Sequence, residues 1–292
     1  MTKKIARESP QRQQHRHART PPAADNITWK VAICFLIVGD ILCKDVWHEW
    51  LSNSDFIITC HAKNCPQKTR DWLEAHGATI VEEVATEWGK PSIAVAMRSV
   101  FSAAFKRGAQ HACLVSQASI PFVSAQKLTR MCSLLKDTSA FKLRISQKIA
   151  APLLKKYKSI RPAEQFCVLS AAGFRAVDMA WDTYFKEFSR YHSNIFESHE
   201  SLMAMDEVFF PAMLHILNQP IENRGVTYSL WETGGSRAAV VTKAFVKQSL
   251  PAILQSKVYL FGRKFDCALY EKELMRQLKT AGVIIDENES FL

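Results

Sequence analysis

The sequence predicts an α/β protein with a mostly parallel, twisted sheet flanked by helices. Three observations support this prediction. Strand-like apolar runs alternate with helix-like spacing through the first 135 residues, as in doubly wound folds. The first run, KVAICFLIVGD at residues 30–40, is continuous, which is typical of a strand buried on both faces. The chain shows no internal repeat, and its 292 residues with 48% hydrophobic content can bury a full core.

Hydrophobic periodicity and turn residues define the elements of the first half. The opening run ends at Gly39-Asp40, the second strand is expected to end at His61, and Gly77 is a natural helix stop. The expected strands are 30–40, 55–61, 78–84 and 111–122, and the expected helices are 46–51, 68–76, 92–106 and 124–135.

The second half is less regular. Helical spacing covers residues 171–188, a polar loop is expected at 189–199, and Pro251 is expected to break a helix at 245–254. The remaining expected elements are extended segments at 141–149, 161–170 and 226–236, the last with a Gly-Gly turn, and helices near 206–214 and at 268–280.

We expect one folded domain and one tail. Residues 27–292 contain no linker rich in Pro, Gly or Ser, so they are predicted to form a single domain, with a nucleotide-binding half (27–123) and an acceptor and catalytic half (124–292). Residues 1–26 carry six basic and two acidic side chains and no apolar segment, which predicts a disordered basic tail. The net charge of +10 favours polyanions, phosphorylated ligands or anionic membranes as partners.

The cysteines and the apolar segments bear on localisation. The eight cysteines show no paired metal-site spacing, so we expect buried free thiols in a reducing compartment. The most apolar window, residues 31–46, is too short and too charged to span a bilayer. A cytoplasmic protein without a membrane anchor is therefore predicted.

The chain is organised around residues 198–214, SHESLMAMDEVFFPAML. Asp206 and Glu207 fit an ordinary helix start, with Asp206 as the cap, because carboxylates favour the first turn of a helix. Two segments downstream, YSLWETGGSR and YLFGRKFD, add an arginine and further cations. One carboxylate facing separated cations is also what a metal-free sugar transferase requires.

Parallel sheets bind ligands beyond the carboxyl ends of their strands. We therefore predict a nucleotide site at the expected strand ends, although a capped, structural role is slightly favoured for the histidine. The residues at these ends are Val38, Gly39, His61, Ala62, Ser116 and Gln117.

Six segments in the same order resemble the core-2 and I-branching beta-1,6-N-acetylglucosaminyltransferase family, including its plant relatives. The resemblance covers roughly residues 29–275. It is carried by WGKPSIAVAMRSVFSAAF, CLVSQASIPFVS, RPAEQFCVLS, MDEVFFPAML, VTYSLWETGGSR and LFGRKFD.

The resemblance implies a GT-A-like glycosyltransferase fold, a nucleoside-diphosphate sugar donor with UDP as the expected nucleotide, and inversion without a metal or other cofactor. In agreement, the chain has no Asp-x-Asp, the usual metal-holding turn of GT-A enzymes. Glu207 matches the family's general base, and Arg237 and Lys264 match its diphosphate-binding cations. The neighbouring Arg263 is a further candidate for diphosphate binding, but Lys264 is preferred, because adjacent side chains on a strand alternate and Arg263 is then expected to point away.

The acceptor side is less defined. Trp231 matches an aromatic position near the acceptor sugar, with a core tryptophan as the alternative, and Asp206 either binds the acceptor, orients Glu207 or caps the helix. A glycan or glycoprotein acceptor is expected. Animal relatives have a membrane anchor and disulfides that are not expected here, which is consistent with a viral or microbial cytosolic enzyme.

The basic tail also allows a second class of function. The basic tail predicts nucleic acid as a further partner, because Lys and Arg contacts to phosphates give largely sequence-blind affinity. The alternatives to a transferase acting on glycans are therefore a DNA-directed glycosyltransferase and a non-enzymatic nucleic-acid-binding protein.

Overall fold

The computed structural model describes residues 29–52, 54–145, 149–197, 204–231 and 238–285. A seven-stranded sheet forms its centre, in the order β3-β2-β1-β4-β7-β6-β8. Only β7 runs against the others, so the predicted mostly parallel sheet flanked by helices is confirmed. The strands are β1 (Val31–Val38), β2 (Ile57–Lys63), β3 (Thr79–Ile80), β4 (His111–Ser116), β6 (Ser139–Phe141), β7 (Val168–Ser170) and β8 (Ile221–Asn223).

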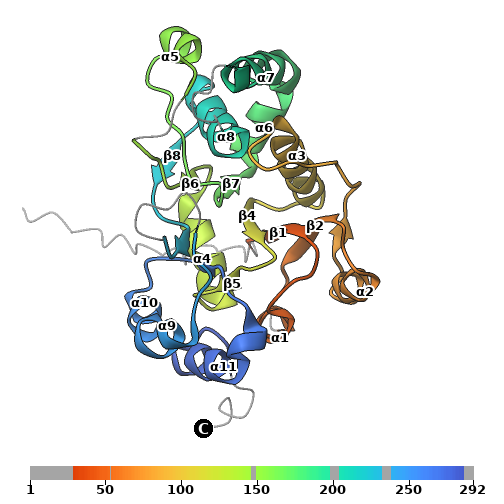
Figure 1. Cartoon of the computed structure of the whole chain (residues 1–292), viewed down its shortest axis with the longest axis vertical. Coiled ribbons are helices and arrows are strands. Elements are labelled where there is room, and N and C mark those ends of the chain that lie inside the picture. Colours follow the sequence, from red (N-terminus) through yellow and green to blue (C-terminus); the bar gives the residue numbers. More distant parts are fainter. Residues whose placement is uncertain (1–28, 53, 146–148, 198–203, 232–237, 286–292) are drawn as a thin grey trace, which may run out of the picture.

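Helices cover both faces of this sheet, and the alternation of side chains along β1 shows how. Ile33 and Phe35 face one hydrophobic core, whereas Ala32 and Cys34 face the other. In Figure 1, α3, α6, α7 and α8 lie together at one end of the molecule, and α9, α10 and α11 lie at the other. The first core is covered by α1 (Lys44–Ser52), α2 (Gln67–Ala75), α4 (Ala125–Leu135), α9 (Lys243–Gln248), α10 (Leu250–Ser256) and α11 (Glu271–Thr280), and the second by α3 (Pro91–Lys106), α5 (Ala151–Tyr157), α6 (Ala171–Met179), α7 (Trp181–Glu197) and α8 (Met205–Ile216).

A second, three-stranded sheet was not predicted. The expected strand at 111–122 splits into β4 and β5 (Ile120–Pro121), because the chain turns between them, with the Ser119 N–H donating to the Ser116 carbonyl at 3.1 Å. β5 pairs with β10 (Phe261–Arg263), which also pairs with β9 (Thr227–Ser229). This small sheet brings the basic YLFGRKFD segment next to the end of β4.

Several boundaries differ from the prediction. The strand expected at 78–84 has only two residues. The Val81 N–H still donates to the Cys60 carbonyl at 2.8 Å, whereas the Val84 N–H donates to the side chain of His61 at 2.8 Å. The strand expected at 55–61 runs on to Lys63, which places His61 inside β2. The extended segment expected at 141–149 is instead the earlier β6, and the last helix begins at Glu271 after a 3₁₀ turn, η1 (Cys267–Leu269).

The prediction of a polar loop at 189–199 is wrong. α7 continues to Glu197, while residues 198–203 lie outside the described part of the chain. Phe185, Phe188 and Tyr191 recur every third position, Tyr184 lies four positions before Phe188, and all four pack into the second core. The polar residues between them form the other face of an amphipathic helix. The break expected near Pro251 is confirmed, since α9 ends at Gln248 and α10 begins at Leu250.

The expectation of free thiols is wrong for one pair. Cys43, before α1, and Cys267, in η1, form a disulfide across 224 residues of sequence, with a Cα–Cα distance of 5.1 Å. Only the fold brings these positions together, so their spacing could not predict the bond. The other six cysteines are free, and five of them are buried. No helix in the described ranges is long and apolar enough to cross a membrane.

Candidate functional site

A cavity of about 470 Å³ lies between the start of α8, the end of β10 and the segment that precedes β7. Several residues singled out in the sequence line it, although they are distant from one another in the chain. These residues are Gln117, Asp206, Glu207, Trp231, Arg263 and Lys264.

The start of α8 presents the two carboxylates. The helix begins at Met205 with Ala204 as its N-cap, so Asp206 lies in the first turn. The expectation that Asp206 caps the helix is therefore wrong. From Val208 to Leu214 every residue of α8 is buried, which leaves its amino-terminal turn as the place where charge faces the cavity. The positive end of the helix dipole favours carboxylates there.

Both carboxyl groups are difficult to ionise. Burial is the largest cause that raises the pKa of Glu207 to about 7; the nearby charges of Asp206 and Glu164 act in the same direction, and Arg144 and Arg263 oppose the shift. Burial also raises the pKa of Asp206, which is 8% exposed, to about 6. A carboxyl group that titrates near neutrality can both accept and release a proton at working pH.

The end of β10 supplies the cations. Gly262 lies against the ring of Phe122, where an added Cβ would come within 2.0 Å of the ring, so the strand sits too close to accept a side chain there. Arg263 and Lys264 both line the cavity, which corrects the expectation that Arg263 points away. Alternation does not extend to Lys264 because β10 ends at Arg263.

Arg263 is held in an unusually dry position. Its guanidinium lies 4.4 Å from the ring centroid of Phe166, and burial lowers its pKa to about 10 against the opposing pull of Glu164, Glu207 and Asp206. Arg263 Nε and Asp206 Oδ1 are buried without a hydrogen-bond partner among the described residues. Buried polar atoms without partners are costly, and a ligand that occupies the cavity can supply the missing bonds.

Sequence reasoning missed Arg144 and Glu164. Arg144 Nη1 lies 3.8 Å from Glu207 Oε2, and its Nη2 lies 3.5 Å from Glu164 Oε1. The same guanidinium stacks over Trp231 at 5.0 Å. Glu164 belongs to the RPAEQF segment that carried the family resemblance, but nothing in the sequence indicated that its carboxylate reaches the site.

The predicted nucleotide residues do not gather in this cavity, apart from Gln117. His61 is 1% exposed, and its Nε2 accepts the Val84 N–H, which fits the structural alternative. Ser116 is buried and hydrogen-bonded to Ser119, Ala62 is buried, and the neighbouring Val38 and Gly39 occupy the end of β1.

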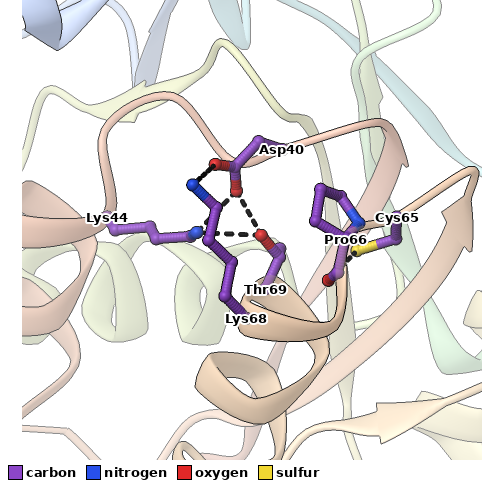
Figure 2. Close-up of polar contacts among 6 residues, drawn as sticks. All are labelled: Asp40, Lys44, Cys65, Pro66, Lys68 and Thr69. Carbon is purple, nitrogen blue, oxygen red and sulfur yellow. Dashed lines mark hydrogen bonds and ion pairs between the residues drawn. The ribbon is translucent and has the colours of Figure 1, made fainter.

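Polar contacts fix the chain just beyond Gly39 (Figure 2). Asp40 lies 2.5 Å from Lys44 Nζ and 3.5 Å from Lys68 Nζ, and it accepts a hydrogen bond from Thr69. Although partial burial acts in the other direction, these contacts hold the pKa of Asp40 below its usual range. The cluster ties the starts of α1 and α2 to the end of β1, the edge where the nucleotide is expected.

Some predicted features lie outside the described residues. They are the tail at 1–26, Arg237 and the Gly-Gly turn. Within the ranges that are described, no group of three His, Cys, Asp or Glu side chains could hold a metal ion. A larger cavity, about 1040 Å³, opens at the amino-terminal ends of β1 and β2 and contains none of the predicted site residues.

The sequence matches no known family profile, and no curated protein is similar to it in sequence. Several solved structures are similar at low identity. The galactosyltransferase LgtC, solved with donor and acceptor sugar analogues, has 9% identity and a TM-score of 0.41 over 88% of this chain and 98% of that one. Mouse xyloside xylosyltransferase 1, in its apo form, has 7% identity and a TM-score of 0.38 over 81% and 97%.

A glucosyl-3-phosphoglycerate synthase from Mycobacterium tuberculosis, solved with Mn²⁺, UDP and glucosyl-3-phosphoglycerate, has 12% identity and a TM-score of 0.35 over 70% of this chain and 86% of that one. Similarity at this level does not define an activity. The assignment of function therefore rests on the site itself, and the core-2 and I-branching resemblance stays a prediction.

Proposed function

We propose that this protein is an inverting, metal-independent glycosyltransferase that moves a sugar from a nucleoside-diphosphate donor, with UDP as the expected nucleotide, to a hydroxyl of a glycan or glycoprotein. The observation that carries the proposal is the meeting of Glu207, Arg263 and Lys264 in one cavity. A base and two cations are what a single displacement at an anomeric carbon requires.

In the proposed reaction, Glu207 is the general base. The acceptor oxygen forms its bond to the anomeric carbon on the face opposite the leaving nucleoside diphosphate, whose bond to that carbon breaks. Glu207 takes the proton that the acceptor hydroxyl loses. The pKa of about 7 for Glu207 supports this role, since a base works best when its pKa lies near the working pH.

Arg263 and Lys264 are proposed to bind the diphosphate, with Arg237 as a further cation that the family resemblance suggests. Negative charge grows on the leaving diphosphate, and fixed cations in a partly dry cavity stabilise it more than solvent does. The unpartnered Nε of Arg263 supports a role in ligand binding. Two cations at this position also support the proposal that no divalent ion is needed.

The aromatic and acidic residues suggest where the acceptor binds. Trp231 is 41% exposed at the cavity, and since Arg144 lies over one face of its ring, the other face is proposed to stack on a pyranose. Asp206, with its unpartnered Oδ1, is proposed to accept a hydrogen bond from a sugar hydroxyl. Gln117, at the end of β4, is proposed to contact the nucleotide.

The direct test measures release of nucleoside diphosphate from a panel of nucleotide-sugars, with glycan acceptors, in EDTA and in added Mn²⁺. We expect turnover with at least one donor in EDTA. Glu207→Gln should reduce kcat by roughly 10²-fold or more while leaving donor affinity nearly unchanged. Glu74→Gln, on the exposed surface of α2, is the matched control. Normal turnover in Glu207→Gln would refute the assignment, and activity that requires Mn²⁺ would refute metal independence.

Donor binding is tested separately by calorimetry with UDP. Arg263→Met and Lys264→Met should each weaken UDP binding by roughly 10-fold or more, because each removes a charge-assisted contact. Arg175→Met, on the exposed surface of α6, is the control. Unchanged affinity in both variants would place the diphosphate elsewhere.

A further inference from the structure

Two segments next to Glu207 are joined by backbone hydrogen bonds. Leu143 and Ala163 form an antiparallel bridge, the Arg144 N–H donates to the Pro162 carbonyl at 2.8 Å, and the Glu164 N–H donates to the Lys142 carbonyl at 2.9 Å. The Ala163 N–H then donates to the carbonyl of Glu207 at 2.8 Å. The backbone therefore fixes the relative positions of three charged residues without help from a ligand.

The side chains form a chain of charges on this frame. Lys142 Nζ lies 3.0 Å from Glu164 Oε1, and the same oxygen is 3.5 Å from Arg144 Nη2. The other arm of the fork, Arg144 Nη1, lies 3.8 Å from Glu207 Oε2. The Glu164 side chain is 8% exposed, so the partner of the Arg144 guanidinium on the side away from Glu207 is a buried carboxylate. Trp231 covers the guanidinium face at 5.0 Å.

We propose that Arg144 and Glu164 act as a positioning pair that orients the Glu207 carboxylate and controls its protonation. The inference rests on the proposed function, in which Glu207 is the base. Neither residue is required to touch the substrate, and both act through Glu207. The Arg144 guanidinium lies between the carboxylates of Glu164 and Glu207 and orients the Glu207 carboxylate toward the cavity. Because Glu164 competes for the same guanidinium, it weakens the ion pair between Arg144 and Glu207.

The two members of the pair have opposite effects on Glu207. Arg144 favours the ionised carboxylate, and the negative charge of Glu164 disfavours it. Burial and Asp206 also disfavour ionisation, while Arg263 favours it. The other charged groups at this place are Lys264, which lines the same cavity, and Lys142, which is bound to Glu164. Removing the charge of Arg144 should therefore shift the titration midpoint of Glu207 upward, and removing the charge of Glu164 should shift it downward.

The experiment compares Arg144→Met and Glu164→Gln by the pH dependence of kcat/KM and by the ¹³C NMR titration of glutamate-labelled protein. The Glu207 resonance is identified by its absence in Glu207→Gln. Arg144→Met should move the midpoint of Glu207 upward by about one pH unit, and Glu164→Gln should move it downward. The acid limb of the rate profile should follow in the same directions. Arg144→Lys keeps the positive charge but loses the bidentate geometry of the guanidinium. The Glu207 midpoint should therefore return most of the way to its wild-type value, whereas kcat should not recover fully.

The matched control is Glu222→Gln, which removes an exposed carboxylate that pairs with Arg224 at 3.4 Å. It should leave the midpoint of Glu207 unchanged. A purely structural role would lower activity in both site variants without opposite shifts, and equal or absent shifts would overturn the proposal. Opposite NMR shifts in a protein that transfers no sugar would support the pair while refuting the proposed reaction, so the two hypotheses fail separately.

Discussion

Replacing Glu207 by glutamine should stabilise the protein at neutral and alkaline pH. Burial, together with Asp206 and Glu164, raises the pKa of Glu207 from 4.5 to about 7 in the folded state, and the side chain is only 19% exposed. Glutamine fills nearly the same volume but carries no charge. The variant therefore removes the cost of keeping an ionised carboxylate in this cavity.

The sign and size follow from proton linkage. The folded protein holds the proton on Glu207 more tightly than the unfolded chain does, so wild-type stability falls as pH rises from 4.5 to 7. Each pKa unit corresponds to about 1.4 kcal/mol, so the full shift costs up to about 3 kcal/mol above pH 7. Below pH 4.5 the group is protonated in both states, and this contribution disappears.

Urea unfolding at pH 5 and pH 8 measures the effect. The stability difference between Glu207→Gln and wild type should be larger at pH 8 than at pH 5 by about 2–3 kcal/mol. Glu74→Gln, at an exposed position on α2, should show no comparable pH dependence. An equal difference at both pH values would mean that Glu207 is not held in a raised-pKa environment, and the argument for it as a neutral-pH base would lose its main support.

Two further predictions concern the frame around the cavity. Gly262→Ala should destabilise the protein by roughly 1–3 kcal/mol and weaken UDP binding, because the added methyl would meet the Phe122 ring and displace the strand that carries Arg263. Thermal melting would measure the stability, and calorimetry would measure UDP binding. Wild-type stability and wild-type UDP affinity in this variant would contradict the close packing of Gly262 against Phe122. Replacing Cys43 and Cys267 by alanine should lower the free energy of unfolding by roughly 2–4 kcal/mol, since the bond closes a long loop. Urea unfolding with and without reductant tests this, and identical stability would show that the disulfide does not form.

The sequence predicted the central part of the fold well, because local pattern and burial agree there. β1 is a continuous apolar run, β2 and β4 are almost entirely buried, and α3 and α4 have clear helical spacing with Pro91 and Ser124 at their starts. The small sheet of β5, β9 and β10 was missed, because its strands are two or three residues long and are stabilised by partners far away in sequence. Short strands have no periodicity of their own to detect.

In the candidate site, too, some residues could be predicted from the sequence and others could not. Glu207 and Lys264 could be identified because each belongs to a recognisable segment. Arg144 and Glu164 could not, since their relation to Glu207 depends on a bridge between Leu143 and Ala163. The orientation of Arg263 could not be predicted, because side-chain alternation does not extend beyond the last residue of β10.

The α/β class, the order of the main strands and helices, and the carboxylate pair at the start of α8 could all be predicted from the amino-acid sequence, because these features follow from hydrophobic patterning and helix chemistry along a single stretch of chain. The three-dimensional fold was needed to show which charges surround Glu207, how they and burial affect its ionisation, and that Cys43 is bonded to Cys267. Those properties depend on distances between distant segments and on exclusion of water, and neither is written in local sequence.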